Sequence, residues 1–424
     1  MLDPRSLAER RDEIAASCRR RGVAADVDGA AALHAQVASK QTELNEANRR
    51  RNEHQEAGKR LSVGERAAHG LEGRALKEAV SRIEAELGAL RARFDEALAK
   101  LPNFIHPAVP DGGEDDSREL HRWGEPRRFA FQALDHVELG AKLELLDFDG
   151  GARVAGQKFY YLKNEAVLLE LALQRFALDL LLEEGFTPYV TPDLARPAIV
   201  DGIGYNPRGS ESQIYSLANA DLCLVGTAEI TLGGLYADAI LSEDELPVQM
   251  AGISHCFRTE AGAAGREGKG LYRVHQFTKV EMFALTRPEE SEAMHERLLG
   301  IEERVFQALE LPYRVVDIAA GDLGAPAWRK FDIEAWMPGR GESGAYGEVS
   351  STSNCTDYQA RRLQTRFRRK GAKKNEYVHM LNGTAVSNAR AILALLENHQ
   401  QADGSIAIPR ALRPYVGRDV IEAR

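Results

Sequence analysis

The first hundred residues carry an apolar pattern that few folds can accommodate. Beyond residue 75 the apolar side chains recur at alternating spacings of four and three, as in the seam of a coiled coil, at Leu76, Val80, Ile83, Leu87, Leu90, Phe94, Ala97 and Leu101. A less complete seam precedes it, at Leu33, Val37, Leu44 and Ala47, interrupted by Lys40 and Arg51. The glycines within residues 61–70 are typical of a turn. The pattern predicts an antiparallel helical hairpin whose arms, of about 30 residues each, are roughly 45–50 Å long.

Basic residues gather near the predicted tip of this hairpin: Arg49, Arg50, Arg51, Lys59 and Arg60. A charged run on a helix is typical of a solvated face. A lone hairpin with a partly polar seam has little to bury, so a partner along its length is the other interpretation. The residues alone leave both open.

The composition limits the classes of protein to consider. With 424 residues, 44% of them hydrophobic, and a net charge of −9, the chain can form two domains but has no overall basic field for nucleic acid. The scattered cysteines, Cys18, Cys223, Cys256 and Cys355, have no zinc spacing, so we expect reduced thiols and no zinc. No apolar run approaches about 18 residues, and acids interrupt the arginine-rich N-terminus. We therefore expect a cytoplasmic protein without a membrane span.

Residues 101–117 separate the hairpin from the remainder of the chain. This stretch, LPNFIHPAVPDGGEDDS, has the prolines, glycines and acids of a linker. Beyond it, residues 168–186 have the pattern of a long buried helix, and strand-like stretches follow at TPYVTPDL, CLVGTAEI, VQMAGISHCF, HQFTKVEMFAL and YRVVDIAAGD. Regular βαβ alternation is missing. We therefore predict an α+β fold, with a hairpin domain at residues 1–110 and a domain on an antiparallel sheet at residues 111–424.

A glycine-rich turn within residues 257–283 gathers cationic groups between two predicted strands. The chain has no GxxxxGK[ST] loop and no GxGxxG opening a helix, so a polyphosphate would have to be held by arginines. On a strand, Glu260 would share a face with Arg258 and could accept a hydrogen bond from an amino group such as that of adenine. Phe277, on the returning strand, offers a flat surface to a purine. A solvated strand pair is the competing interpretation.

Two further clusters carry polar side chains. Glu348 and Ser351 lie three residues apart in a polar run, and a carboxylate with a hydroxyl oxygen suits Mg²⁺ held together with phosphates. Near the C-terminus, Asn382 and Thr384 end a polar strand that runs into an amphipathic helix carrying Arg390. In isolation Arg390 could be a surface charge. Near Glu348 it would be a second phosphate clamp.

Together these stretches resemble the signature motifs of class II aminoacyl-tRNA synthetases, and within that class the seryl-tRNA synthetase family. The long helix followed by Pro192 is similar to motif 1, FRTEAGAAGREGKGLYRVHQF to motif 2, and the segment ending at Arg390 to motif 3. GTAEI resembles the family's serine-binding loop. The linker PNFIHPAVP, the stretch HRWGEPRRF and the tail LLENHQQADGSIAIPRALRPYVG also follow the family pattern, so the resemblance covers nearly the whole chain.

The resemblance implies a role for each of these residues. Arg258 would hold the α-phosphate of ATP and Arg390 the γ-phosphate, with Arg258, Arg390 and Glu348 forming the catalytic set. The implied ATP-binding residues are Arg258, Thr259, Glu260, Arg273, Val274, Phe277, Glu348, Val349, Ser350, Ser351 and Arg390. Glu348 and Ser351 would carry Mg²⁺. The implied serine-binding residues are Thr227, Ala228, Glu229, Arg258, Glu281, Asn382 and Thr384. The turn with Arg266 and Lys269 would close over ATP and later meet the tRNA 3′ end.

The implied activity is that of a serine–tRNA ligase. It would form seryl-adenylate from L-serine and ATP and transfer the seryl group to tRNA(Ser), with tRNA(Sec) left open as a second acceptor. The basic hairpin tip, at Arg49, Arg50, Arg51, Lys59 and Arg60, would bind the long variable arm of the tRNA, and motif 1 would form a homodimer. Two alternatives are a ligase that loads an amino acid onto a carrier protein, whose members generally lack the hairpin, and a non-catalytic binding protein, which should have lost the ligands retained here.

Overall fold

The computed structural model describes residues 1–62, 64–205, 213–260 and 268–424. The chain forms two compact units, Met1–Phe104 and Ile105–Arg424. The division into a tRNA-binding domain at residues 1–110 and a catalytic domain at residues 111–424 concerns function as well as fold and stays a prediction. No helix within the described ranges has the length and apolar character needed to cross a membrane. The four cysteines are all buried.

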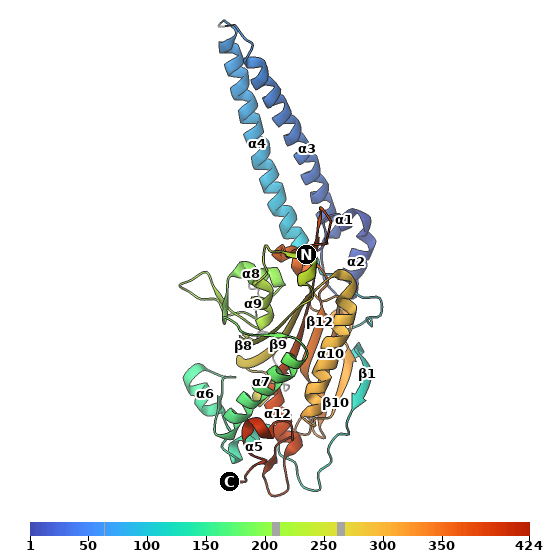
Figure 1. Cartoon of the computed structure of the whole chain (residues 1–424), viewed down its shortest axis with the longest axis vertical. Helices are drawn as coiled ribbons and strands as arrows, with labels where there is room; N and C mark the ends of the chain where they lie inside the picture. Colours follow the sequence, from blue (N-terminus) through green and yellow to red (C-terminus); the bar gives the residue numbers. More distant parts are fainter. Residues whose placement is uncertain (63, 206–212, 261–267) are drawn as a thin grey trace. The chain divides into compact units, whose positions relative to one another are not determined.

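The first unit is helical and contains the predicted hairpin, drawn in blue in Figure 1. Its helices are α1 (Ser6–Glu9), α2 (Arg11–Arg20), α3 (Val27–Gly58) and α4 (Arg66–Ala99). Asp26 begins α3, because its side chain accepts the backbone N–H of Gly29 at 2.7 Å. The second arm begins at Arg66, so Gly70, which was expected in the turn, lies within α4. The turn between the arms is therefore shorter than predicted.

The two arms contribute unequally to the seam between them. On α4 the side chains of Val80, Ile83, Leu87, Phe94 and Leu98 are buried. Leu98 takes the seam position predicted for Ala97, which is only partly buried. On α3 the seam is more polar, and the Nζ of Lys40 donates to Glu86 of α4 at 2.9 Å. The hairpin is therefore held by one apolar stripe, mostly from α4, and by polar contacts across it.

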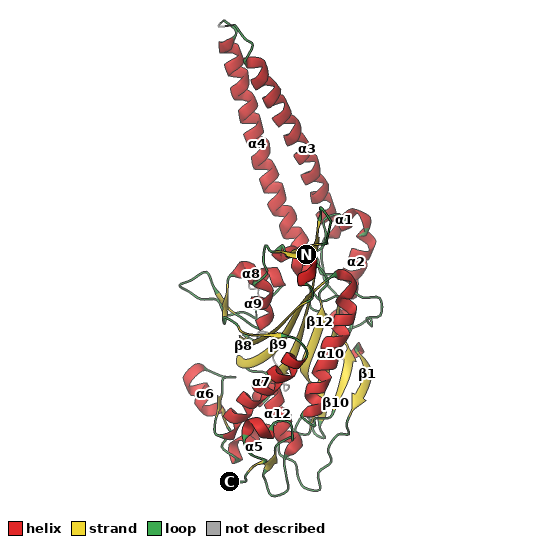
Figure 2. Cartoon of the chain, in the orientation of Figure 1, coloured by secondary structure: helices red, strands yellow, loops and turns green. Residues whose placement is uncertain are grey.

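The second unit is built on an eight-stranded sheet, shown in yellow in Figure 2. In spatial order its strands are β1 (Arg118–Trp123), β10 (Tyr313–Asp317), β11 (Arg329–Met337), β12 (Ala345–Asn354), β15 (His379–Ser387), β9 (Gln276–Thr286), β8 (Val248–Phe257) and β4 (Thr187–Val190). Neighbouring strands are antiparallel except β4 and β8, which are parallel. The predicted α+β class on an antiparallel sheet is confirmed.

Helices cover this sheet and make its core. They are α5 (His136–Lys142), α6 (Phe148–Ala155), α7 (Glu165–Glu183), α8 (Pro197–Ile203), α9 (Ala228–Gly234), α10 (Ser291–Ala308), α11 (Tyr358–Leu363), α12 (Asn388–His399) and α13 (Arg413–Val416). The main apolar cluster joins α7, α10 and α12 to the central strands. A second cluster gathers side chains of α8, α9 and α11. Both faces of β9 are covered, since its residues from Lys279 to Thr286 are all buried.

Short strands complete the unit. They are β2 (Leu146–Asp147), β3 (Tyr161–Leu162), β5 (Leu194–Ala195), β6 (Cys223–Leu224), β7 (Ile240–Ser242), β13 (Arg366–Arg368), β14 (Asn375–Tyr377), β16 (Ile406–Ala407) and β17 (Val420–Ile421). The strand predicted for CLVGTAEI is wrong beyond Leu224, because the chain there turns into α9. The Oγ1 of Thr227 accepts the backbone N–H of Glu229 at 3.3 Å and so begins that helix.

Removal of a large side chain from the main apolar cluster should destabilise the second unit. Phe306 on α10 is fully buried in the main apolar cluster. Phe306→Ala should lower the free energy of unfolding by about 3–5 kcal/mol, because it removes apolar contacts and leaves a void. All three tryptophans, Trp123, Trp328 and Trp336, lie in the second unit, so fluorescence during urea unfolding reports on it. Glu296→Ala, at an exposed position of the same helix, is the control and should change stability by less than about 0.5 kcal/mol.

Candidate active site

A cavity of about 90 Å³ lies where β9, β12, β15 and α12 meet. It is lined mostly by charged and polar side chains from segments far apart in the sequence. Eleven of the predicted site residues line it: Arg258, Glu260, Arg273, Val274, Phe277, Glu348, Val349, Ser350, Ser351, Thr384 and Arg390. The structure therefore brings together the residues predicted for ATP and for catalysis, with one exception. Thr259 does not line the cavity, and its backbone N–H donates to the carbonyl of Gln213 at 3.1 Å.

Arg258 and Glu260 reach this cavity by a route that differs from the predicted one. β8 ends at Phe257, so neither residue lies on the strand, and Glu260 has a positive φ of 50°. Strand alternation therefore does not place them together. Arg258 donates from Nε to the carbonyl of Gly226 at 3.2 Å, and its guanidinium carbon lies 5.4 Å from the ring centre of Phe277. Glu260 accepts a hydrogen bond from Arg273 at 3.2 Å.

An irregularity in β12 explains how Glu348 and Ser351 face one cavity. Residues three apart on a regular strand point to opposite faces. Here the register with β11 shifts, since Glu348 pairs with Glu334 while Ser350 pairs with Ile333, so β12 carries one extra residue. The shift restores Glu348 and Ser351 to the same face. Both are partly exposed, whereas Val349 and Ser350 between them are buried.

The electrostatics keep Glu348 ionised. Its partly buried position alone would raise the pKa of its carboxyl, but Arg390, with Lys330 and Arg258, lowers that pKa to about 2. Arg390 donates from Nη1 to the carbonyl of Glu348 at 2.9 Å and lies 3.3 Å from its carboxylate. An ionised carboxylate and a hydroxyl on one face of a cavity fit the oxygen ligands that Mg²⁺ accepts beside phosphates. No group of three or more His, Cys, Asp and Glu side chains suited to a metal occurs in the described part of the chain.

The residues predicted for serine form a deeper polar cluster next to this cavity. Glu229 accepts hydrogen bonds at one carboxylate oxygen from Asn382 at 2.9 Å and from Gln359 at 2.7 Å. Glu281 pairs across the sheet with Thr384 and forms an ion pair with Lys279. Thr227 and Ala228 are buried at the start of α9. Because a Cβ built at Gly252 would lie 3.0 Å from the Cβ of Ala228, that side chain packs against β8.

Two members of the cluster were missed from the sequence. Lys279 is buried, lines the cavity and donates to the Oγ1 of Thr384 at 3.4 Å. Gln359 is buried and donates also to the carbonyl of Ile203 at 3.0 Å. Lys279 could have been found, because it stands two residues before Glu281 on a predicted strand and so shares its face. Nothing in the sequence around Gln359 points to this site.

The glycine-rich turn is only partly described. Arg266 lies outside the described residues. Lys269 lies outside the cavity, where it forms an ion pair with Asp135. The predicted contact of this turn with ATP and with the tRNA 3′ end therefore stays a prediction.

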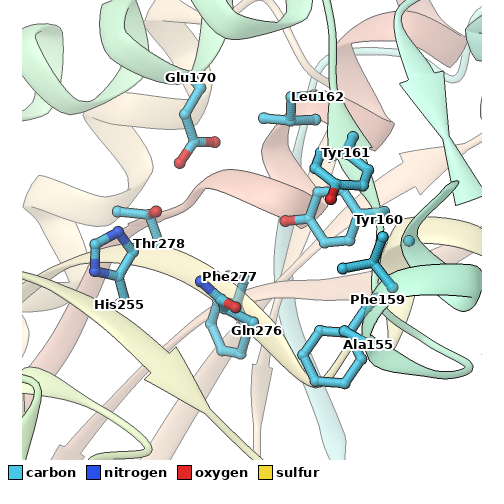
Figure 3. A pocket seen from close by; sticks show the side chains of 12 residues that line it. Ala155, Phe159, Tyr160, Tyr161, Leu162, Glu170, His255, Gln276, Phe277 and Thr278 are labelled. Atoms are coloured by element: carbon cyan, nitrogen blue, oxygen red, sulfur yellow. The ribbon is translucent and has the colours of Figure 1, made fainter.

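A second cavity of about 390 Å³ shares only Phe277 with the first (Figure 3). Aromatic side chains line one side of it, including Phe159 and Tyr160. Glu170 of α7 extends into it towards Thr278, and burial raises the pKa of this carboxyl. None of the other predicted site residues lines this second cavity.

Comparison with known proteins defines first the class and then the family. Residues 215–399 match the tRNA synthetase class II core domain (G, H, P, S and T), and every residue that lines the first cavity lies within this range. Residues 1–105 match the seryl-tRNA synthetase N-terminal domain. The chain belongs to the seryl-tRNA synthetase family.

Full-length relatives agree with this family. The chain is 53% identical to the serine–tRNA ligase of Rhodopirellula baltica over 424 residues, covering 100% of both chains. It is 53% identical to that of Rubrobacter xylanophilus over 423 residues, covering 99% of both. The seryl-tRNA synthetase of Pyrococcus horikoshii, solved in complex with ATP, superposes with a TM-score of 0.91 at 39% identity, covering 100% of both chains.

Burial of Glu229 predicts a pH-dependent stability. Burial, followed by the nearby Glu281, raises the pKa of Glu229 from 4.5 to about 7. Between these values the unfolded chain loses the proton that the folded chain keeps, so this group lowers stability as the pH rises. The free energy of unfolding of Glu229→Gln, relative to that of the unmodified protein, should therefore rise by on the order of 2 kcal/mol as the pH is raised from 5 to 7.5.

Urea unfolding followed by tryptophan fluorescence at both pH values measures this difference. Acids that do not interact with Glu229 contribute equally in both proteins, so their contributions cancel. Glu296→Gln, on an exposed position of α10, is the matched control and should show no such trend. A Glu229→Gln difference that stays constant from pH 5 to pH 7.5 would contradict the assignment.

Proposed function

We propose that this protein is a serine–tRNA ligase, which forms seryl-adenylate from L-serine and ATP and transfers the seryl group to tRNA(Ser). The observation that carries the proposal is the joining of Arg258, Glu348 and Arg390 in one cavity of a chain of this family. Two fixed guanidinium groups and one ionised carboxylate suit a polyphosphate with its metal ion.

In the proposed reaction ATP binds at this cavity and extends beyond it. Phe277 and Val274 contact adenine, while Glu260 accepts from its amino group and Thr259 adds backbone contacts nearby. Arg258 holds the α-phosphate, and Arg390, with Arg273, holds the outer phosphates. Glu348 and Ser351 would hold Mg²⁺, and Val349 and Ser350 form the wall between them. Mg²⁺ when bound neutralises phosphate charge.

Serine is recognised by the deeper cluster. The carboxylates of Glu229 and Glu281 attract its ammonium group, and Asn382, Thr227 and Thr384 offer hydrogen bonds to its polar atoms. Ala228 contributes through the backbone, because its side chain packs against β8. Alanine lacks the hydroxyl of serine and would leave these buried polar groups unpaired, so it is rejected.

The first step needs no protein base, because the serine carboxylate is already ionised. One of its oxygens bonds to the α-phosphorus, the bond from that phosphorus to the bridging oxygen breaks, and pyrophosphate leaves with the electron pair. Arg258 stabilises the charge that builds on the α-phosphate oxygens. In the second step the oxygen of a terminal ribose hydroxyl of the tRNA bonds to the seryl carbonyl carbon and gives up its proton, the bond from that carbon to the phosphate oxygen breaks, and AMP leaves with the electron pair.

The remaining assignments concern partners. Exposed apolar side chains on α7, including Val167 at 40% and Leu171 at 58% exposure, support a homodimer through this helix. At the end of the sheet β4 pairs with β8 alone among the described strands, so its other edge can join the same interface.

The arm residues Arg49, Arg50, Arg51, Lys59 and Arg60 bind the tRNA, whether tRNA(Ser) alone or tRNA(Sec) also. A tRNA substrate and four buried cysteines support a cytoplasmic location.

Serine-dependent exchange of pyrophosphate into ATP, measured against a panel of amino acids, tests the proposed activity. Serine should support exchange and alanine and threonine should not. Exchange with another amino acid in place of serine would overturn the proposed substrate. A product on a carrier protein instead of tRNA would favour the alternative ligase.

Arg258→Ala should lower the exchange rate by about 10²–10³-fold, because one preorganised donor to the α-phosphate is lost. The fold should be kept, as judged by the same thermal unfolding midpoint within a few degrees. Arg368→Ala, which removes an exposed arginine on β13, is the control and should exchange at the unmodified rate. Exchange by Arg258→Ala within threefold of the unmodified rate would refute this role.

Charge reversal on the arm should separate the two half-reactions. Arg49 and Arg50 are each about two-thirds exposed, with side-chain accessibilities of 65%, and form ion pairs with neighbouring acids on α3. Changing Arg49, Arg50 and Arg51 to Glu should leave pyrophosphate exchange intact but weaken tRNA binding at least tenfold, roughly one lost phosphate contact for each arginine. Changing the same three to Lys keeps the charge and is the matched control.

Filter binding of tRNA at several salt concentrations gives the second readout. The logarithm of affinity should fall less steeply with the logarithm of salt in the Glu variant, by a slope of about 0.7–0.9 for each lost contact. Equal slopes and equal transfer rates in the Glu and Lys variants would show that these arginines do not touch the tRNA.

A further inference from the structure

A buried histidine–glutamate pair lies just outside the ATP cavity and takes no part in the chemistry described above. His136 opens α5, and Glu397 lies near the end of α12; their side chains are 5% and 2% exposed. The Nδ1 of His136 lies 2.7 Å from the Oε1 of Glu397. The backbone N–H of His136 donates to the same oxygen at 3.1 Å, and that of Gly339 donates to Oε2 at 2.8 Å.

The other ring nitrogen of His136 makes the contact that matters for the site. The backbone N–H of Leu271 lies 3.1 Å from Nε2. A backbone N–H can only donate, so Nε2 must accept, and the ring proton must therefore sit on Nδ1 and point to Glu397. The carboxylate of Glu397 fixes both the tautomer and the orientation of the ring, as acidic partners of functional histidines do.

Leu271 belongs to the short 3₁₀ turn Gly270–Tyr272, which returns the glycine-rich segment to β9. Its next residue, Tyr272, accepts at its carbonyl a hydrogen bond from the Nε of Arg390 at 3.2 Å. The ring of Tyr272 lies 4.7 Å below the guanidinium carbon of Arg390. The residues after the turn, Arg273, Val274 and Phe277, line the ATP cavity. The position of this turn therefore sets one wall of the cavity and one partner of Arg390.

Helix α12 holds the turn at two points. Arg390 and Glu397 are seven residues apart, close to two helical turns, so they lie on the same side of α12. Arg390 reaches the turn directly, inside the cavity. Glu397 reaches it through His136, outside the cavity.

Two glycines allow this close approach. Gly270 has a φ of +59°, and a Cβ built there would lie 2.0 Å from the Nε2 of His136. A Cβ at Gly339 would lie 2.8 Å from the Oε1 of Glu397. Side chains at either position would push the pair away from the backbone it contacts.

We propose that His136 and Glu397 are positioning residues for ATP: they fix the Gly270–Tyr272 turn against α12, so that Tyr272 and Arg390 are set before ATP binds. The inference rests on the proposed function for its kinetic readout. It assigns no contact with ATP to either residue. Their effect is therefore on the binding and orientation of ATP and not on the selection of serine.

Two conservative variants test separately the two side-chain hydrogen bonds of His136, one at Nε2 and one at Nδ1. His136→Gln can place an amide oxygen near the position of Nε2 and so restore an acceptor for Leu271. His136→Asn can place an amide donor near the position of Nδ1 and so keep the bond to Glu397, but it leaves Leu271 unpaired. We expect His136→Asn and His136→Ala to raise the KM for ATP about tenfold or more, because a displaced wall misorients the phosphates. His136→Gln should stay within about threefold, and the KM for serine should change little in all three.

His399→Gln is the matched control for a merely structural effect. His399 is also buried and donates from Nε2 to the carbonyl of Leu309 at 3.0 Å, away from the cavity. If the inference holds, this variant should leave the KM for ATP unchanged, even where its thermal midpoint falls as far as that of His136→Asn. Equal KM values for ATP in His136→Asn, His136→Gln and the unmodified enzyme would overturn the inference, as would a rise in His399→Gln matching that in His136→Asn.

Calorimetric titration with ATP alone keeps this test independent of the proposed activity. The Kd for ATP should follow the same order, with His136→Asn weakest and His136→Gln near the unmodified protein. If the unmodified protein binds ATP but supports no serine-dependent exchange, the proposed function fails while the order of Kd values still decides the role of His136. If the unmodified protein does not bind ATP, both are overturned.

Discussion

The pairing of β9 with β15 is the constraint on which the catalytic unit depends. The ladder runs from Lys279 opposite Ser387 to Thr286 opposite His379, so it joins segments about a hundred residues apart in the chain. It sets Glu281 opposite Thr384 and, by continuing into α12, carries Arg390 to the cavity that Arg258 enters from β8. A slip of one residue would turn every side chain of one strand to the opposite face and empty the site. Both strands are buried on two sides, which makes such a slip costly.

The site concentrates charge that the surrounding protein must compensate. Glu348 is held ionised by arginine, whereas Glu229, next to Glu281 in the deeper cluster, has a pKa raised to about 7. The two carboxylates differ because Arg390, Lys330 and Arg258 outweigh the effect of burial on the pKa of Glu348, whereas burial, followed by the nearby Glu281, dominates the pKa of Glu229. An incoming ammonium group would supply the counter-charge that Glu229 lacks. The same environment that weakens the fold at neutral pH thus favours a cationic ligand.

The sequence predicted the parts of this protein that follow from periodicity. A repeat of 3.5 residues identified the hairpin, and alternation identified β8 and β9 nearly to their ends. Local backbone events were not predictable in this way. The extra residue in β12 and the positive φ of Glu260 depend on the tertiary fold, yet they decide which side chains face the cavity.

Residues that act through a partner were also beyond prediction from a motif. Gln359 joins the deeper cluster through hydrogen bonds to Glu229 and Ile203, each more than a hundred residues away in the chain. His136 meets Leu271 across more than a hundred residues. No sequence spacing predicts the role of such a side chain, because its contacts are made only in the tertiary fold. By contrast, Arg258 and Arg390 stand in stretches whose local composition already suggested phosphate.

The unequal seam of the hairpin has a mechanical consequence. In the described part of the arm, buried side chains occur on α4 from Val80 onward and on α3 only at Val27 and Ala30, so the outer half has none. Local opening costs least where few apolar contacts must be broken. Amide hydrogen exchange along α3 and α4 should therefore become faster from the base of the hairpin to its tip. The base is then rigid and the tip is flexible. This gradient of local stability lets the tip adapt its shape to a bound partner while the base stays folded.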